Sequence, residues 1–200
     1  MGEIRTDSKL RIGCLVLAAG ASRRLGTPKQ LLVFEGKTLL RRAAETAVSA
    51  GFEPVIVVLG SETEKSAEEV FPLGVKIHVN KDWEAGMSSS IKAGLGHLLE
   101  LEPEIDGVMI TLCDQPRIKS ENLLHLIDKF EEAGAPIVAA GYEGIAGVPA
   151  LFSKECFDRL AGIDGDTGAK DLIRRGGFQV DVVDLPSAAF DIDTPDDAGI

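Results

Sequence analysis

Apolar and polar positions along the chain follow two patterns. Short continuous apolar runs, rich in β-branched residues, predict buried strands. These runs are 12–18, 54–59, 75–79, 106–113 and 136–140. Between them, apolar residues spaced three and four apart predict amphipathic helices. The helical segments are 38–50, 62–71, 87–100 and 120–133.

The regular alternation of strands and helices is typical of an α/β fold. It predicts a single domain with a doubly wound, mostly parallel sheet of Rossmann-like type. After Gly141 the alternation weakens, and Gly144, Gly147 and Pro149 indicate a turn or an irregular hairpin. Short helices over 154–160 and 168–174 and strands over 178–185 and 190–192 complete the predicted elements. The whole chain, 1–200, fits one domain, with 1–10 as a flexible leader.

The loop after the first predicted strand carries the most informative chemistry. Residues 15–32 read LVLAAGASRRLGTPKQLL, so an apolar strand opens into a loop of small and basic residues. Small residues let backbone N–H groups approach phosphate oxygens, and the cations neutralise charge. Two common nucleotide motifs are excluded: no glycine lies between Gly20 and Gly26, and Lys29 is not adjacent to Gly26. The loop therefore predicts a different kind of nucleotide site.

Composition narrows the function classes. The chain is 44% hydrophobic and 26% charged, as in ordinary globular proteins, with a net charge of −11. This acidity argues against nucleic-acid binding, although a local positive field could still hold a phosphorylated ligand. No apolar run is long enough to span a membrane, and the polar N-terminus is not a secretory signal, so we expect a cytoplasmic protein. The three cysteines lack zinc-type spacing and are expected to be reduced, buried thiols.

Ionisable residues after the strands suggest phosphate and metal chemistry. Lys29 and Arg24 are candidates to stabilise a triphosphate and the charge that develops during phosphoryl transfer. Asp114 follows an apolar strand, where it could hold Mg²⁺ or cap a turn, and the residues alone weigh these two roles evenly. Asp191 and Asp193 face the same side if their segment is extended, so either could complete the metal site; Asp193 is slightly favoured. The alternative for both is solvation of an acidic C-terminal segment.

A second candidate anion site lies at the start of the helix over 87–100. The hydroxyls of Ser88 and Ser89, with backbone N–H groups of the first turn, could bind an anion, or one serine could simply cap the helix. Trp83, just before this helix, could stack on a ligand ring or pin the loop to the core. The histidines show neither a catalytic triad nor zinc spacing.

Several motifs in order resemble one family. The loop pattern L-A-A-G-x-S-x-R-x-G-x-x-K-x-L-L is followed by NKDWEAGMSSS at 80–90, CDQP at 113–116, GVP at 147–149, GDTGAK at 165–170 and DIDTPDD at 191–197. From about residue 12 to the C-terminus, the chain resembles the molybdenum cofactor cytidylyltransferase branch of the sugar-nucleotidyltransferase-like fold.

This resemblance implies a reaction and a site. The reaction is the Mg²⁺-dependent transfer of CMP from CTP to the terminal phosphate of molybdenum-loaded molybdopterin, and a recipient molybdoenzyme is a further expected partner. The implied catalytic residues are Lys29, Arg24 and Asp114, with Asp114 and either Asp193 or Asp191 holding the metal. The implied nucleotide-binding residues are Leu17, Ala18, Ala19, Gly20, Ser22, Arg24, Lys29, Asn80, Ser88 and Ser89.

Three alternatives stay open. The PKQ at 28–30 also resembles the methylerythritol-phosphate cytidylyltransferases, but their D-A-A-R-P segment is replaced here by CDQP. The guanylyltransferases of molybdenum cofactor synthesis typically begin G-G-x-A-R-R, whereas this loop reads A-A-G-A-S-R-R, which favours cytidylyl transfer. A non-catalytic chaperone that delivers molybdopterin is the third, and the joint presence of Lys29, Asp114 and Asp193 argues against it.

Overall fold

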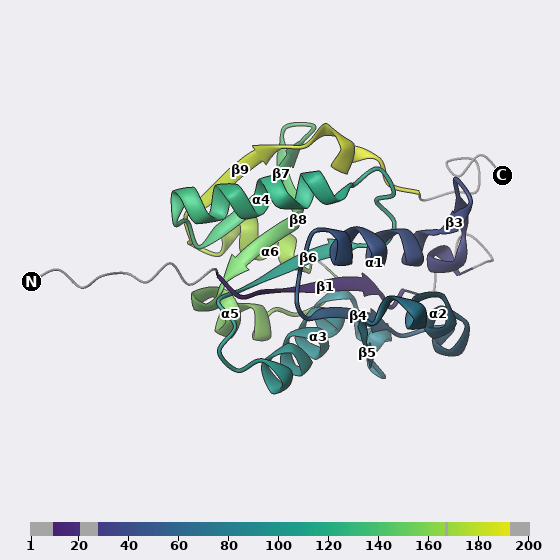
Figure 1. Ribbon diagram of the computed structural model, residues 1–200. Coiled ribbons are helices and arrows are strands. Elements are labelled where there is room, and N and C mark those ends of the chain that lie inside the picture. Colours follow the sequence, from purple (N-terminus) through teal and green to yellow (C-terminus); the bar gives the residue numbers. More distant parts are fainter. Residues whose placement is uncertain (1–9, 21–27, 167, 193–200) are drawn as a thin grey trace, which may run out of the picture.

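A seven-stranded sheet forms the centre of the protein. The computed structural model describes residues 10–20, 28–166 and 168–192. The strands lie in the order β5-β4-β1-β6-β8-β7-β9 (Figure 1). Their bounds are β1 Ile12–Ala18, β4 Val55–Leu59, β5 Lys76–Val79, β6 Gly107–Leu112, β7 Ile137–Tyr142, β8 Ile145–Ser153 and β9 Val180–Asp184. Neighbouring strands are parallel except at β8, which runs antiparallel to β6 and β7. The predicted α/β fold with a mostly parallel sheet is therefore confirmed.

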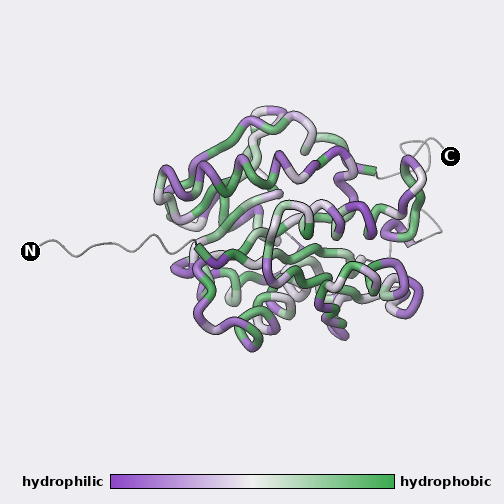
Figure 2. The backbone as a smooth tube through the Cα atoms, viewed as in Figure 1, coloured by the Kyte–Doolittle hydropathy of each residue, from purple (hydrophilic) through white to green (hydrophobic). Residues whose placement is uncertain are grey.

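Helices cover both faces of this sheet. They are α1 Leu39–Ser49, α2 Thr63–Val70, α3 Met87–Leu101, α4 Ser120–Ala133, α5 Phe157–Ala161 and α6 Ala169–Arg175. Along β1, Cys14 and Val16 join the core cluster that contains α1, α2 and α4, whereas Leu15 and Leu17 join the one that contains α3, α5 and α6. Figure 2 shows the apolar strands inside and polar positions on the outer turns of the helices.

Local sequence accounts for where these elements begin and end. Every residue of β1 is buried, as expected for a central parallel strand covered on both faces. α1 begins after Thr38, whose hydroxyl accepts a hydrogen bond from the Arg41 N–H at 3.2 Å. α4 ends at Gly134, which adopts a left-handed conformation. Since β1, β4 and β6 are parallel, their carboxyl ends meet at one edge of the sheet.

The main departure from the predicted elements is β8. The segment expected to be a turn or irregular hairpin contains a nine-residue strand that inserts between β6 and β7. The β7–β8 pairing passes from Ala139–Ala150 to Ala140–Gly147, so Val148 and Pro149 form a bulge. Proline lacks the N–H that a regular ladder requires, which explains both the bulge and the weak strand signal.

Smaller departures lie near the two ends of the chain. A two-stranded hairpin, β2 Val33–Phe34 with β3 Lys37–Thr38, was not predicted. The expected strand over 190–192 does not form. Residues 1–9 of the predicted leader lie outside the described residues. Within the part of the chain that the structure describes, no helix is long and apolar enough to cross a membrane.

Candidate active site

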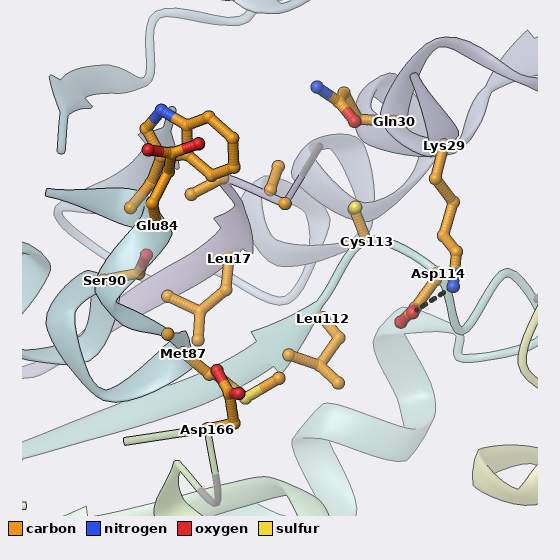
Figure 3. Close-up of a pocket in the computed structure, with 15 residues that line it drawn as sticks. Leu17, Lys29, Gln30, Glu84, Met87, Ser90, Leu112, Cys113, Asp114 and Asp166 are labelled. Atoms are coloured by element: carbon orange, nitrogen blue, oxygen red, sulfur yellow. Dashed lines mark hydrogen bonds and ion pairs between the residues drawn. The ribbon is translucent and has the colours of Figure 1, made fainter. Parts of the chain in front are cut away.

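A cavity of about 550 Å³ opens at the sheet edge where β1 and β6 end. Ligands of doubly wound sheets bind at such carboxyl edges. The cavity is lined by Leu17, Ala18, Ala19, Gly20, Lys29, Gln30, Trp83, Glu84, Gly86, Met87, Ser90, Leu112, Cys113, Asp114 and Asp166 (Figure 3). Three segments far apart in the sequence therefore meet here, as the fold predicted: the loops after β1 and β6 and the loop before α3.

Lys29 and Asp114 form an ion pair at one end of the cavity. The Lys29 Nζ lies 3.0 Å from Asp114 Oδ2, and the two side chains are 17% and 22% exposed. The other carboxylate oxygen, Asp114 Oδ1, is buried and accepts no hydrogen bond from any described residue. A buried, unsatisfied carboxylate oxygen is costly unless a cation compensates it. Mg²⁺ binds one or two carboxylates together with substrate phosphates, so Asp114 fits a metal ligand.

The start of the DIDTPDD segment runs beside Asp114. The Ile192 N–H donates to the Asp114 carbonyl oxygen at 3.0 Å, which places exposed Asp191 near this end of the cavity. Burial raises the pKa of Tyr142, and the charges of Asp191 and Asp114 raise it further against an opposing effect of Arg174. Asp193 lies outside the described residues. Among those that are described, no three acidic, histidine or cysteine groups are arranged to hold a metal.

The end of β1 and the loop that follows it line the cavity. Leu17, Ala18, Ala19 and Gly20 all line it, whereas Ser22 and Arg24 lie outside the described residues. Ser61 holds the loop through two hydrogen bonds. Its N–H donates to the Ala19 carbonyl at 3.2 Å, and its hydroxyl donates to the Gly20 carbonyl at 3.0 Å. Gln30 in turn donates to the Ser61 carbonyl at 3.2 Å. These bonds leave the small residues of the loop facing the cavity.

Three predicted nucleotide-binding residues do not line the cavity. The Asn80 amide donates to Ser89 Oγ at 2.8 Å and to Ser90 Oγ at 3.0 Å, and its oxygen accepts from the Asp82 N–H. Ser89 Oγ also donates to the carbonyl of Gly86. Asn80 and Ser89 therefore fasten the loop to the first turn of α3. Ser90, rather than Ser88 or Ser89, reaches the cavity.

The first turn of α3 is also partly closed to anions. The Ser88 N–H donates to the Gly165 carbonyl at 3.1 Å, and the Ser89 N–H donates to the Gly86 carbonyl at 3.1 Å. Both N–H groups are thus already engaged. The Ser88 hydroxyl is buried without a hydrogen-bond partner in the described chain, but it lies behind the cavity lining.

Trp83 holds its loop against the core, which is one of the two roles considered for it, and it also lines the cavity. The side chain is half-buried, lines the cavity and packs on Gly60, where an added Cβ would lie 2.6 Å from the Trp83 ring and 2.6 Å from the Ala19 carbonyl oxygen. Only glycine at position 60 permits this approach. The ring therefore pins its loop against the loop after β1 and still offers a surface to a ligand.

Sequence reasoning missed the acidic lining of the far end. Glu84 and Asp166 line the cavity away from Lys29 and Asp114 (Figure 3). The glycines that flank Asp166 in GDTGAK were the sequence feature that could have pointed to this part of the cavity. Cys113 also faces the cavity, but burial raises the pKa of its thiol above its usual range, so it stays protonated at neutral pH. All three cysteines are buried and unbridged, as expected.

Comparison with known proteins agrees with the motifs. The model of the MobA-like NTP transferase domain matches residues 14–181. The nicotine blue oxidoreductase of Paenarthrobacter nicotinovorans is 31% identical over 97% of this chain and 96% of its own. The purine catabolism protein PucB of Bacillus subtilis is 30% identical, covering 90% and 91%. The molybdenum cofactor cytidylyltransferase of Escherichia coli is 25% identical, covering 93% of each.

A solved structure adds a metal to this comparison. Rv0371c of Mycobacterium tuberculosis, solved in complex with manganese, is 30% identical and superposes with a TM-score of 0.77, covering 94% of this chain and 95% of that one. The resemblance that the ordered motifs predicted is confirmed at the level of the family.

Proposed function

We propose that this chain, which belongs to the MobA-like NTP transferase family, transfers CMP from CTP to the terminal phosphate of molybdenum-loaded molybdopterin. The observation that carries the proposal is the Lys29–Asp114 ion pair, in which one carboxylate oxygen has no hydrogen-bond partner among the described residues. This pair lies at the end of a cavity that is also lined by Leu17–Gly20, at the end of β1 and the start of the following loop. The 25% identity to a cytidylyltransferase supports the choice of substrates.

The chain's own residues suit an in-line displacement without a general base. A phosphate oxygen of the acceptor attacks the α-phosphorus of CTP, the bond to the β-phosphate oxygen breaks, and pyrophosphate leaves. The attacking phosphate is already anionic near neutral pH, since its second pKa is about 6. Lys29, with Arg24, stabilises the charge that develops on the phosphoryl oxygens. Asp114, with Asp193 or Asp191, would hold Mg²⁺, which supplies charge neutralisation when bound.

A matrix of nucleotides and acceptors tests this proposal. The four NTPs are each incubated with Mg²⁺ and with molybdopterin, methylerythritol phosphate or no acceptor, and pyrophosphate release is measured. We expect release only with CTP and molybdopterin. Release with another phosphorylated acceptor would retain the reaction class but replace the substrate. Molybdopterin binding without any pyrophosphate release would instead identify a delivery chaperone.

An oxidoreductase is the second candidate, because the 31% identical relative bears that name. The Lys29–Asp114 pair favours the first candidate, since a cation and an unsatisfied carboxylate suit a metal-bound phosphate better than a redox reaction. Oxidation of NADH or NADPH by nicotine blue, catalysed by this protein, would support the oxidoreductase. We expect no such oxidation above the uncatalysed rate.

A further inference from the structure

The loop before α6 closes one end of the cavity. Its residue Gly165 accepts a hydrogen bond from the Ser88 N–H of α3 at 3.1 Å, and Asp164 pairs with Lys92 of α3 at 2.8 Å. An added Cβ at Gly86 would lie 2.8 Å from the Gly165 carbonyl oxygen, so only glycine allows this approach. The loop is therefore docked on the N-terminal half of α3 and acts as a wall of the cavity.

The carboxylate of Asp166 belongs to this wall. It lines the cavity, and Oδ1 lies against the Cα of Gly86 so closely that a Cβ there would clash with it. The carboxylate forms no hydrogen bond or ion pair with any described residue. It does not cap α6 either, since that helix begins after Gly168 without a side-chain cap. Asp166 is exposed, so its carboxylate is accessible to a ligand in the cavity.

The two ends of the cavity differ in charge. Lys29 and Asp114 lie at one end, and Glu84, Met87 and Asp166 lie at the other, with Leu112 between them (Figure 3). Lys29 offers a cation at its end, and no lysine or arginine among the described residues lines the other end, so we expect the phosphates of a nucleotide at the Lys29 end. The base then occupies the acidic end, beside the ring of Trp83. A carboxylate at that end can only accept hydrogen bonds, so it favours a base that presents an N–H donor.

We propose that Asp166 accepts a hydrogen bond from the exocyclic amino group of cytosine and so selects CTP over UTP. This inference rests on the proposed function, which makes CTP the substrate. Cytosine presents an amino donor where uracil presents a carbonyl oxygen, and aspartate is a known partner of that amino group in nucleic-acid recognition. With uracil, two acceptors would face one another, and their repulsion penalises the wrong base.

Binding of CTP and UTP to the full-length protein tests the role of Asp166. Isothermal titration in Mg²⁺ without acceptor gives the ratio of the two dissociation constants, and GTP is titrated alongside. We expect the parent protein to bind CTP roughly tenfold or more tightly than UTP. Asp166→Asn keeps the side-chain volume but adds an amide donor that can pair with uracil. This variant should bring the ratio to within about threefold of unity.

Asp171→Asn is the matched control, because it removes an exposed carboxylate of the nearby helix α6 that does not line the cavity. It should leave the ratio unchanged. An unchanged ratio in Asp166→Asn, or a parent that does not discriminate between CTP and UTP, would overturn the role of Asp166 alone. Tighter binding of GTP than of CTP by the parent would overturn both this inference and the proposed cytidylyl transfer.

Discussion

The two carboxylate oxygens of Asp114 have different surroundings, and this difference makes Asp114 the central residue of the proposed metal site. Oδ2 lies 3.0 Å from the Lys29 ammonium, whereas Oδ1 is buried without a partner among the described residues. A bound cation would give Oδ1 the partner that the protein does not supply. The same cation would compete with Lys29 for the carboxylate and would weaken this ion pair, so that the ammonium can contact a phosphate. Metal and nucleotide should therefore bind cooperatively.

Asp114→Asn should abolish Mg²⁺-dependent turnover while leaving the fold intact. The substitution removes a ligand charge but hardly changes the side-chain volume. Steady-state pyrophosphate release gives the turnover, and thermal unfolding checks the fold. Activity within about threefold of the parent, less than 1 kcal/mol in the barrier, would contradict the metal assignment.

Lys29→Ala should lower turnover by about a hundredfold or more, since it removes a cation placed to stabilise the transferring phosphate. The rate is measured at saturating Mg²⁺ and CTP, so that weaker binding does not obscure the effect. Lys65→Ala is a control, because it removes a cation that is 73% exposed and does not line the cavity. A negligible loss in Lys29→Ala would show that this lysine is merely an ion-pair partner.

At the scale of elements, the site depends on close contacts between loops that follow different strands. Gly60, which follows β4, lies so close to the Ala19 carbonyl and the Trp83 ring that an added Cβ would clash with both. Gly60→Ala should destabilise the protein by about 1–3 kcal/mol, since backbone atoms cannot yield to the new methyl group. Gly96→Ala is the control: this exposed helical glycine has open space around it, so alanine should stabilise α3 by about 0.5–1 kcal/mol.

Urea denaturation measures both changes, and the fluorescence of the single tryptophan reports the displacement of the loop. A Gly60→Ala protein with parental stability and an unshifted emission spectrum would show that the three loops are not held against one another as described.

The contact of edge strand β5 with α3 should depend on pH. Burial and the nearby His97 lower the pKa of His78 below 6.5, and the two rings are 4.9 Å apart. Below pH 6.5 the unfolded chain then binds more protons than the folded one, so stability is full above pH 6.5 and falls as the pH drops through the folded-state pKa.

Urea denaturation at pH 7.5 and 5.5 checks this dependence. His78→Gln should show a smaller loss of unfolding free energy between these two conditions than the parent does. Equal losses in the two proteins would assign the pH dependence to other groups.

Most of the fold could be predicted from hydrophobic period alone. β1 has the predicted bounds, and α3 and α4 begin where expected, because long periodic segments are dominated by burial. β8 could not be predicted, since Gly147 and Pro149 hide a strand whose pairing depends on a bulge opposite β7. Antiparallel insertion into a parallel sheet is a tertiary property that no local pattern carries.

At the scale of the whole molecule, topology brings distant motifs to one cavity in an acidic protein. Lys29 and Asp114 meet there because their loops follow strands β1 and β6, which are adjacent and parallel in the sheet. Asn80 looked like a ligand-binding residue, but its amide is used to hold its own loop. Asp166 was missed because its place depends on how the loop before α6 docks on α3. Side-chain partners of this kind are decided by packing rather than by spacing.

Because the net charge of the chain is −11, the positions of the cations that line the cavity decide where an anionic ligand can bind. Lys29 lies at the end of the cavity proposed to accept phosphate, and Glu84 and Asp166 lie at the other end (Figure 3). We therefore expect a nucleotide to bind with its triphosphate at the carboxyl ends of β1 and β6. The proposed cytidylyl transfer and the role of Asp166 therefore both require a nucleotide that binds in this direction and whose base is cytosine.

The most direct measurement compares CTP and GTP as donors to molybdenum-loaded molybdopterin. Label from the α-phosphate of each nucleotide is followed into the pterin product, and the ratio of the two kcat/KM values is determined. We expect label transfer from CTP with a strong preference over GTP, because side chains in the loop after β1 leave less room for a purine and the site pairs with one base edge. A ratio near one, or a preference for GTP, would contradict cytidylyl transfer, and no label transfer from either nucleotide would contradict the enzyme itself.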